Sequence, residues 1–578
     1  MLQIRLLGWR HLQPWPAPRE QQVPRGRSFE PGGVDRHGPA STVDLHLPSS
    51  GAQADLRLDA LHSGARRCDA GFIGGGLLAV HDSARGQARD RHAQKQVRHP
   101  AHAHRVVIGG VRDCGGAPRG DLSASGADDA AGAGCRSGFS LSGASDNLGG
   151  DMADPTLIRL DNGMRVAVES LERSRSVSIC LLVPGGSAHD PEERQGRSAL
   201  FAETLLRGAG DMDARALACA LDAAGASRHV DVETFHMRLS AATTVDRFAQ
   251  LAPLLATIVL EPRFAEQDFE PARQLCLAEL EGLKDDPHER VLTLLREKHH
   301  PSPRNRSGLG TRQGLEALTR SEVVKGWEEV ARPEGAIVGV AGAVERDAAV
   351  EAFARAFESW RGAPPPLARG ETPVRGLHAL VEPTHQTHIA VAHDAAAEPD
   401  PASALDRLAA AVLSGGMAGR LFTTLRERRS LCYAVSAAYG ADRDFGQIAA
   451  YVGSTPDKAQ EALEALVEEL VRIRSVAGAV TQEEFERAKV GLRSRFVLSG
   501  ESTGARAAAL ARDVRVLGRP RSLQEALAPL ERASLGDLNE HLERGVAGAL
   551  TAVAIGPAPL RPPAPLSLTS VVEAEATT

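Results

Sequence analysis

Alternating apolar and polar positions begin near residue 154 and continue almost to the end of the chain. Residues 157–160 lead to a hairpin turn signal at residues 161–163, and residues 164–169 then alternate as a half-buried strand does. An apolar run at residues 176–183 predicts a second strand, and apolar side chains at helical spacing across residues 196–207 predict an amphipathic helix. The region therefore opens with strands that are followed by a helix.

The later part of this region repeats the plan of the first. Residues 388–393 read as a strand, residues 401–413 as a helix, residues 415–429 as a further helix and residues 431–439 as an alternating strand. Each part also contains, late in its length, a charged amphipathic helix, at residues 266–284 and 481–498. Because strands and helices come in clusters, the pattern favours two related α+β domains of mixed sheet plus helices over an alternating βαβ array.

A proline-rich stretch separates the two parts and sets the predicted domain boundaries. We expect an N-terminal domain at residues 152–361, a linker at 362–376, a C-terminal domain at 377–562 and a disordered tail at 563–578.

The first 150 residues differ in composition from everything that follows. They hold 24 of the 57 glycines and 9 of the 20 histidines but a single lysine, and no hydrophobic period is sustained over an element. We expect residues 1–151 to be a low-order extension. Two explanations are open, a mis-assigned start with Met152 as the true first residue, or a natural disordered tail.

Composition excludes several classes of protein. A net charge of −7 argues against a nucleic-acid binder, and no apolar run approaches the roughly 20 residues that a membrane helix needs. The seven cysteines have no regular spacing and predict scattered thiols rather than a disulfide framework. Without an export signal after Met152, the predicted compartment is the cytoplasm.

Five segments together resemble the pitrilysin/insulinase family of inverted zinc metallopeptidases, closest in size to its mitochondrial-processing-peptidase-like bacterial members. They are residues 160–166, residues 196–208, the helix through Glu279 that ends at residues 285–287, residues 309–311 and residues 414–435. The resemblance extends from residue 154 to about residue 556. It implies the two-domain fold of that family and peptide hydrolysis as the associated chemistry.

The zinc site of that family is a His-x-x-Glu-His helix, in which two histidines bind zinc and the glutamate acts as general base. In the matching place this chain has Ala199, Ala202 and Glu203, so the resemblance implies that both histidines and the base are lost. The family's third ligand corresponds to Glu279. Two carboxylates without an imidazole make a poor zinc site, and the alternative is that both are surface or salt-bridged acids. We therefore expect no metal on this chain.

Other candidate ligands and nucleophiles have simpler interpretations. His299 and His300 are neighbours, and neighbouring side chains on a helix do not face one another, so a loop or helix-end role is expected. Cys432 should point away from the face that Tyr433 occupies, and with no histidine placed to activate it we expect a structural thiol.

The second half keeps a feature that the family uses in catalysis. Arg426 and Tyr433 stand seven residues apart and match the family's arginine/tyrosine pair. The resemblance implies that they bind the substrate carbonyl and stabilise the oxyanion that forms during hydrolysis. The alternative is a solvated helix cation and an ordinary strand aromatic.

This split pattern predicts a zinc-less subunit of a heterodimeric metallopeptidase, inactive alone, that supplies Arg426 and Tyr433 to a zinc-bearing family member. The zinc would then lie in the partner, and the substrate would be a peptide or unfolded polypeptide bound in extended form along a sheet edge. One alternative is a non-catalytic homologue that acts as an assembly or peptide-binding scaffold, and another is an autonomous peptidase with a different metal arrangement. Retention of the pair favours the catalytic partner.

Overall fold

The computed structural model describes residues 154–545 and 550–563, together with the backbone of residues 570–574. The predicted extension at residues 1–151 and the proposed start at Met152 lie outside the described residues.

The first half is built on a six-stranded mixed sheet with the order β1-β2-β8-β3-β7-β6. β2 and β8 run parallel, and the remaining neighbours are antiparallel. β3 is a central strand, and its near-continuous burial explains why its sequence is apolar at successive positions. The strands are β1 (Thr156–Arg159), β2 (Arg165–Ser170), β3 (Ser176–Pro184), β6 (Ser227–Val232), β7 (His236–Thr244) and β8 (Ile337–Gly342).

The second half is built on a six-stranded sheet with the order β11-β12-β10-β13-β9-β14. Its strands are β9 (Leu377–Val381), β10 (Thr387–Ala395), β11 (Cys432–Ala441), β12 (Gly446–Ser454), β13 (Thr551–Gly556) and β14 (Ser570–Ala574). Five of them repeat the order and directions of the first sheet, because β9, β13, β10, β12 and β11 take the places of β2, β8, β3, β7 and β6. The prediction of two related α+β domains of mixed sheet is confirmed.

The sixth strand of each sheet breaks the repeat. β1 pairs antiparallel with β2 through a hairpin, whereas β14 comes from the end of the chain and pairs parallel with β9. β14 lies within residues 563–578, where the sequence predicts a disordered tail, so residues 570–574 differ from that expectation. A strand as short as β14 has no periodic pattern that the sequence could reveal. It is ordered by pairing with β9.

Helices fill the connections in the same order in both halves. The first half contains α2 (Arg197–Leu205), α3 (Ala214–Ala223), α4 (Phe248–Leu260), α5 (Glu266–Gly282), α6 (Pro287–His299), α7 (Arg312–Ala317), α8 (Arg320–Val330) and α9 (Arg346–Ala356). The second half contains α10 (Ser403–Ser414), the π-helix η5 (Phe422–Arg428), α11 (Ala459–Arg472), α12 (Gln482–Gly500), α13 (Thr503–Leu517), α14 (Leu523–Arg532) and α15 (Leu535–Glu543).

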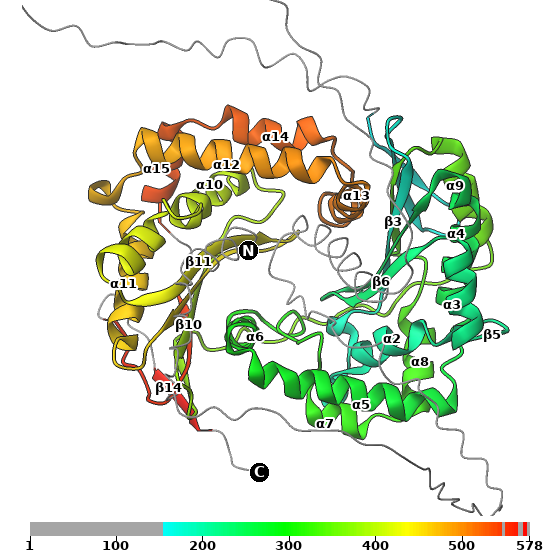
Figure 1. Ribbon diagram of the computed structural model, residues 1–578, viewed down its shortest axis with the longest axis horizontal. Helices are drawn as coiled ribbons and strands as arrows, with labels where there is room; N and C mark the ends of the chain where they lie inside the picture. Colours follow the sequence, from blue (N-terminus) through cyan, green and yellow to red (C-terminus); the bar gives the residue numbers. More distant parts are fainter. Residues whose placement is uncertain (1–153, 546–549, 564–569, 575–578) are drawn as a thin grey trace, which may run out of the picture. The chain divides into compact units, whose positions relative to one another are not determined.

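Each sheet is covered on one face by helices of its own half and on the opposite face by a helix from the other half. Leu510 and Val514 of α13 are buried against Leu182 and Ile337 of the first sheet. In the same way α6 packs against β10 and β13 of the second sheet, and Figure 1 shows α6 and α11 on opposite sides of β10. Gly339 permits the close approach of α13, because a Cβ there would lie 2.1 Å from a backbone oxygen of the helix. Both sheets are therefore buried on two faces.

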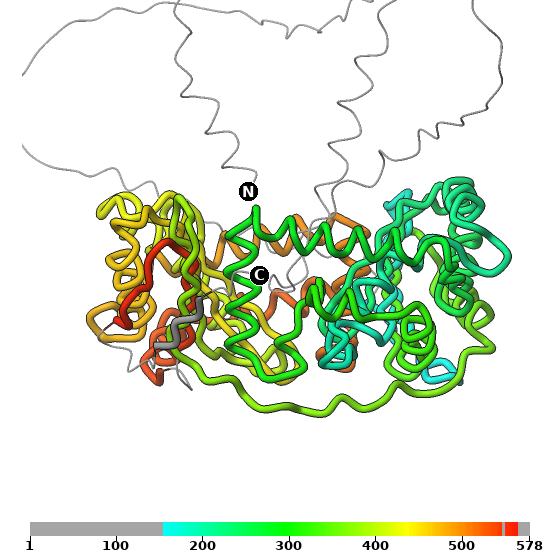
Figure 2. The backbone as a smooth tube through the Cα atoms, turned by 90° about the horizontal axis from the view of Figure 1, so that it is seen from below, coloured from blue at the N-terminus to red at the C-terminus, as the bar shows by residue number. Residues whose placement is uncertain are grey.

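The segment between α9 and β9 contains no helix or strand, and Figure 2 shows it as an extended yellow-green tube. In the described part of the chain, no helix combines the length and the apolar character needed to cross a bilayer.

Candidate functional site

The helix α2 carries the positions at which the sequence predicts a lost zinc motif, and a buried carboxylate fixes its start. Asp190 accepts hydrogen bonds from the backbone N–H groups of Gly196 and Ser198 and from the Ser198 hydroxyl, each at 2.9 Å. Burial raises the pKa of Asp190 to about 6 despite these bonds. Gly196 has a φ of +112°, a conformation that favours glycine. The register of α2 is thus set by specific contacts before its first turn.

All three motif positions on α2 are buried. Ala199 and Ala202 present only methyl groups, and Glu203 lies within 3.4 Å of the Arg207 guanidinium as an ion pair. Glu279 is half-buried on α5, the helix that packs against α2. The structure therefore places the predicted positions on two packed helices of the first half.

These residues do not fit a zinc ion. Zinc in proteins takes nitrogen or sulfur ligands in addition to carboxylates, and α2 supplies neither. No two histidines of the whole sequence stand four residues apart, so the pair of ligands cannot be formed elsewhere on a helix. Within residues 154–545 and 550–563, no three His, Cys, Asp or Glu side chains form a group that could hold a metal ion.

Arg426 lies on η5, where the helix widens from the regular α-helical pattern. The backbone N–H of Arg429 donates to the carbonyl of Thr424 five residues earlier, and such π-helical turns recur at functional sites. The Arg426 guanidinium carbon lies 4.8 Å from the centre of the Phe422 ring and 5.6 Å from the centre of the Tyr433 ring. The structure thus brings together the two residues that the sequence pairs.

Tyr433 is directed outward by an irregularity in β11. Cys432 pairs with Ser454 and Ala434 pairs with Gly453, so Tyr433 is an additional residue that forms a β-bulge. Bulges change the direction of a side chain next to functional sites, and the Tyr433 side chain is 81% exposed.

The turn between η5 and β11 is held in an uncommon conformation. Ser430 has a φ of +51°, which non-glycine residues rarely adopt, and the Lys458 ammonium donates to its carbonyl at 3.0 Å. The next residue, Leu431, donates its N–H to the Leu425 carbonyl and accepts a hydrogen bond from the Ser454 hydroxyl. The backbone on both sides of the turn is therefore fixed, and with it the separation of Arg426 and Tyr433.

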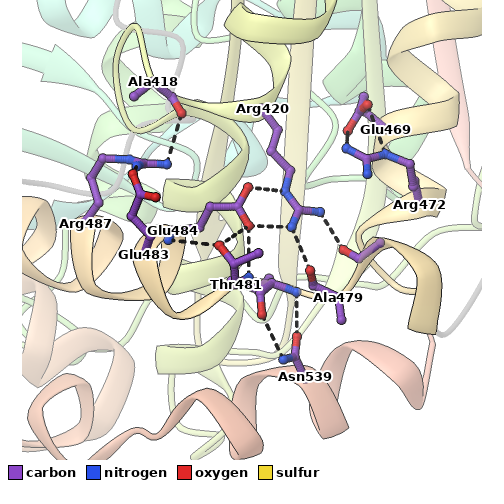
Figure 3. Close-up of polar contacts among 12 residues, drawn as sticks. Ala418, Arg420, Glu469, Arg472, Ala479, Thr481, Glu483, Glu484, Arg487 and Asn539 are labelled. Carbon is purple, nitrogen blue, oxygen red and sulfur yellow. Dashed lines mark hydrogen bonds and ion pairs between the residues drawn. The ribbon is translucent and has the colours of Figure 1, made fainter. Parts of the chain in front are cut away.

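A partly buried ion pair anchors the chain just before η5. Arg420 donates from Nε and Nη2 to the two oxygens of Glu484, each at 2.7 Å, and from Nη1 and Nη2 to the carbonyls of Gly478 and Ala479 (Figure 3). Glu484 also accepts from Thr481 in the capping box at the start of α12. The start of η5 is therefore tied to the start of α12.

Arg426 and Tyr433 form a pair of exposed hydrogen-bond donors. Among the described residues Arg426 contacts aromatic rings and makes no ion pair, whereas Arg429 on the same turn pairs with Glu461 and Glu468. An unpaired guanidinium next to a phenol can bind a carbonyl oxygen and favour negative charge on it.

Cys432 lies beside the pair but faces the core of the second half. Burial raises the pKa of its thiol to about 11, so the sulfur is protonated at neutral pH and is not an activated nucleophile.

Sequence reasoning missed the residues that position the pair and α2. The capping-box pattern of Thr481 and Glu484 was available as a signal, but its link to Arg420 joins positions 64 residues apart. Asp190 stands eight residues before Ser198, a spacing that belongs to no helical or strand period.

Comparison with known families connects both halves to one group. The family described as Insulinase (Peptidase family M16) matches residues 165–307, and the one described as Peptidase M16 inactive domain matches residues 317–492. The chain belongs to the insulinase family, peptidase family M16. The M16 match begins at β2 and ends within α12, so it includes α2, η5 and β11.

M16 relatives occur in several bacteria. A protein named as an uncharacterized zinc protease of Mycobacterium leprae is 28% identical over 394 residues, which cover 66% of this chain and 86% of the relative. One of Bacillus subtilis with the same kind of name is 23% identical over 388 residues, covering 65% of this chain and 92% of the relative.

Solved structures share the M16 fold. A peptidase M16 inactive domain from Pseudomonas fluorescens gives a TM-score of 0.61 at 18% identity, covering 71% of this chain and 100% of that one. A protease from Helicobacter pylori gives a TM-score of 0.62 at 19% identity, covering 69% and 99%.

Proposed function

We propose that this chain is the zinc-less subunit of a heterodimeric M16 metallopeptidase and supplies Arg426 and Tyr433 to a zinc-bearing family member. The contrast between the two halves carries the proposal. The second half holds an exposed guanidinium 5.6 Å from the centre of a phenol ring, while α2 offers methyl groups at Ala199 and Ala202. A protein used only for assembly has no chemical requirement for such a pair of donors.

The pair would act on the carbonyl of the peptide bond to be cleaved. The Arg426 guanidinium and the Tyr433 hydroxyl can both donate hydrogen bonds to that oxygen, and negative charge develops on it during hydrolysis. Because η5 and the β-bulge hold both groups in advance, little reorganisation is needed when the charge forms. Zinc would be held by the partner, and no step requires a metal on this chain.

The substrates we propose are peptides or unfolded polypeptides in extended form. β6 and β11 are each one of the two outer strands of their sheets, and an outer strand can pair with an extended chain through its backbone groups. The cytoplasm is the compartment that the sequence predicts.

Peptide hydrolysis by mixtures of subunits tests the proposal. The full chain is assayed alone and with an M16 relative from the same genome that carries His-x-x-Glu-His. The variants are Arg426→Ala and, as a matched control, Arg428→Ala, which removes an exposed arginine of the same helix two residues away. We expect hydrolysis only in the mixture, a large loss with Arg426→Ala and little change with Arg428→Ala.

Three results would contradict the proposal. Hydrolysis by the isolated chain would mean that it does not need a partner's zinc. A stable complex that never hydrolyses peptides, or one whose activity is equally insensitive to both arginine variants, would favour the scaffold function.

A further inference from the structure

A cavity of about 240 Å³ lies in the second half, outside the Arg426/Tyr433 pair. It is formed between α10, α12 and β11, and residues that follow α12 also contribute to its open-sided wall. The charged residues on its wall are Glu398, Arg407, Arg495, Arg512 and Arg521. Four guanidiniums in one small cavity require an explanation that the proposed function does not give.

A single carboxylate in the cavity wall is shared by three of these arginines. Glu398, with a side chain that is 2% exposed, lies 2.9 Å from Arg407, 3.2 Å from Arg512 and 3.2 Å from Arg521. Burial favours protonation of Glu398, but the three guanidiniums outweigh it and lower its pKa to about 2. The glutamate is therefore ionised at neutral pH and neutralises one of the three charges.

The fourth arginine has no carboxylate partner in the described part of the chain. Arg495 is exposed and donates only to the backbone oxygen of Gly491, at 3.3 Å. Arg521 has a second partner in Asp513, at 2.7 Å. The four arginines of the wall thus have two carboxylate partners, Glu398 in the wall and Asp513 beside it. The wall therefore carries an excess of positive charge and has N–H donors available for an anion.

The cavity borders β11, an outer strand of its sheet in the described part of the chain. Its wall includes the consecutive residues Ala437, Ala438 and Tyr439, and consecutive strand residues point to opposite faces of a sheet. Contact with all three means that the cavity borders the backbone of β11 and not only the side chains of one face. β11 is the outermost strand of its sheet, and an extended peptide can pair with such an edge.

Size and position restrict the occupant. A volume of about 240 Å³ is below the roughly 300–1,000 Å³ of sites for drug-sized ligands, and it suits one or two side chains better than a cofactor. In the repeat, α10, β11 and α12 take the places of α2, β6 and α5, so the cavity occupies the counterpart of the region around Ala199 and Glu279.

We infer that this cavity binds a peptide carboxylate, either an acidic side chain or a C-terminal carboxylate, of a peptide that lies along the free edge of β11. The inference rests on the proposed function in one respect, that the chain binds extended peptides. It adds the class of substrate: peptides with an anionic group next to the segment on β11.

Direct binding of matched peptides to the full chain tests the inference without any partner. Fluorescence anisotropy compares a neutral peptide that contains one glutamate with its glutamine version, both amidated, and a neutral peptide with a free C-terminus with its amide. We expect the protein to bind the glutamate or the free-acid peptide about tenfold more tightly than its neutral match. The pair that discriminates identifies which carboxylate is bound.

Two variants of α12 locate the binding. Arg495→Gln should reduce the discrimination to about twofold or less, because it removes the unpaired guanidinium while leaving a side chain of similar length. Arg493→Gln is the matched control, since Arg493 is exposed on the same helix, approaches Glu531 only to 3.8 Å and is not part of the cavity wall. It should leave the discrimination unchanged.

Equal affinity within both peptide pairs would overturn the inference, as would discrimination that both variants reduce equally. These results are separate from those for hydrolysis. If the protein does not discriminate between the peptides but still supports hydrolysis with a partner, only the proposed role of the cavity is contradicted. If the protein discriminates between the peptides but never supports hydrolysis, only the proposed function is contradicted.

Discussion

Arg420 and Glu484 illustrate how single residues position a site that they do not contact. Burial favours protonation of Glu484, but hydrogen bonds from Arg420 and Thr481 outweigh it and lower its pKa to about 2. Asn539 fixes the same corner, because its side chain bonds both the N–H and the carbonyl of Val480. The corner drawn in Figure 3 thus holds the chain that leads into η5.

We predict that this ion pair makes stability depend on pH. The pKa of Glu484 is lower in the folded protein than the ordinary 4.5, so its contribution is complete above pH 4.5 and is lost as the pH falls toward about 2. Because the pair is partly exposed to solvent, which screens it, the shift corresponds to about 1–3 kcal/mol of stability. Denaturant unfolding of the native protein and Glu484→Gln should therefore differ by up to that amount at pH 6, and the difference should shrink as the pH falls from 4.5 toward 2.

The neighbouring glutamate provides the control for this prediction. Glu483 is 89% exposed and pairs with Arg487 at the surface. Glu483→Gln should change the free energy of unfolding by less than about 0.5 kcal/mol at any of these pH values. A difference for Glu484→Gln that stays constant down to pH 2 would contradict the assigned charge.

A second prediction at this scale concerns the hydroxyl of Tyr433. Tyr433→Phe keeps the ring that contacts Arg426 and removes only one donor. We expect kcat of the proposed complex to fall by about 10²–10³, the usual cost of losing one oxyanion-stabilising donor, with little change in KM. Steady-state kinetics of the reconstituted complex measure both, and a rise in KM alone would instead assign the hydroxyl to substrate binding.

At the scale of elements, the start of α2 is set by contacts outside the three predicted motif positions. Asp190 and Gly196 fix where the helix starts, and α5 with Glu279 packs against it. If the register of α2 is the one that the sequence predicts, restoring the motif side chains at residues 199, 202 and 203 should restore metal binding.

We predict that Ala199→His/Ala202→Glu/Glu203→His will create a zinc site between α2 and α5. Metal analysis after dialysis against trace zinc should give about one zinc per folded chain, because the two histidines would stand four apart with Glu279 on the adjacent helix. The control Ala199→His alone should hold none. A folded triple variant without zinc would show that the register or the position of Glu279 is wrong.

Sequence patterns predicted most elements here but not their irregularities. The run from 176 to 183 and the helix from 266 to 284 correspond closely to β3 and α5, because apolar periodicity reports burial directly. The predicted helix at residues 415–429 is instead a turn followed by a short helical segment that includes η5, and the strand after it contains the bulge at Tyr433. Both irregularities depend on tertiary contacts, such as Ser454 with Leu431, that no local pattern encodes.

At the scale of the whole molecule, α13 connects the halves through a buried ion pair. Arg506 donates to both oxygens of Glu169 on β2, at 2.7 and 2.9 Å, and neither side chain is more than 6% exposed. His299 on α6 makes the reciprocal connection, since it is fully buried and bonds the Thr551 hydroxyl at 2.9 Å. The sequence predicts a helix-end role for His299, and its contact with a strand 252 residues later could not be anticipated.

We predict that Arg506→Met lowers the free energy of unfolding by about 3–5 kcal/mol, because it leaves the Glu169 carboxylate buried without its partner. Arg355→Met is the control, since it breaks an exposed pair with Glu351 and should cost less than about 0.5 kcal/mol. Denaturant titration measures both. Equal small effects would mean that Glu169 finds water or another donor.

The reciprocal placement of α6 and α13 also changes what the linker at residues 362–376 does. Each half contributes a helix that packs on the sheet of the other half. We therefore expect the two halves to stay associated when the linker between them is cut. A protease cut in the linker would yield two fragments that co-purify, and two separately expressed genes could reassemble the protein. Covalent continuity here contributes mainly a high effective concentration of each half for the other.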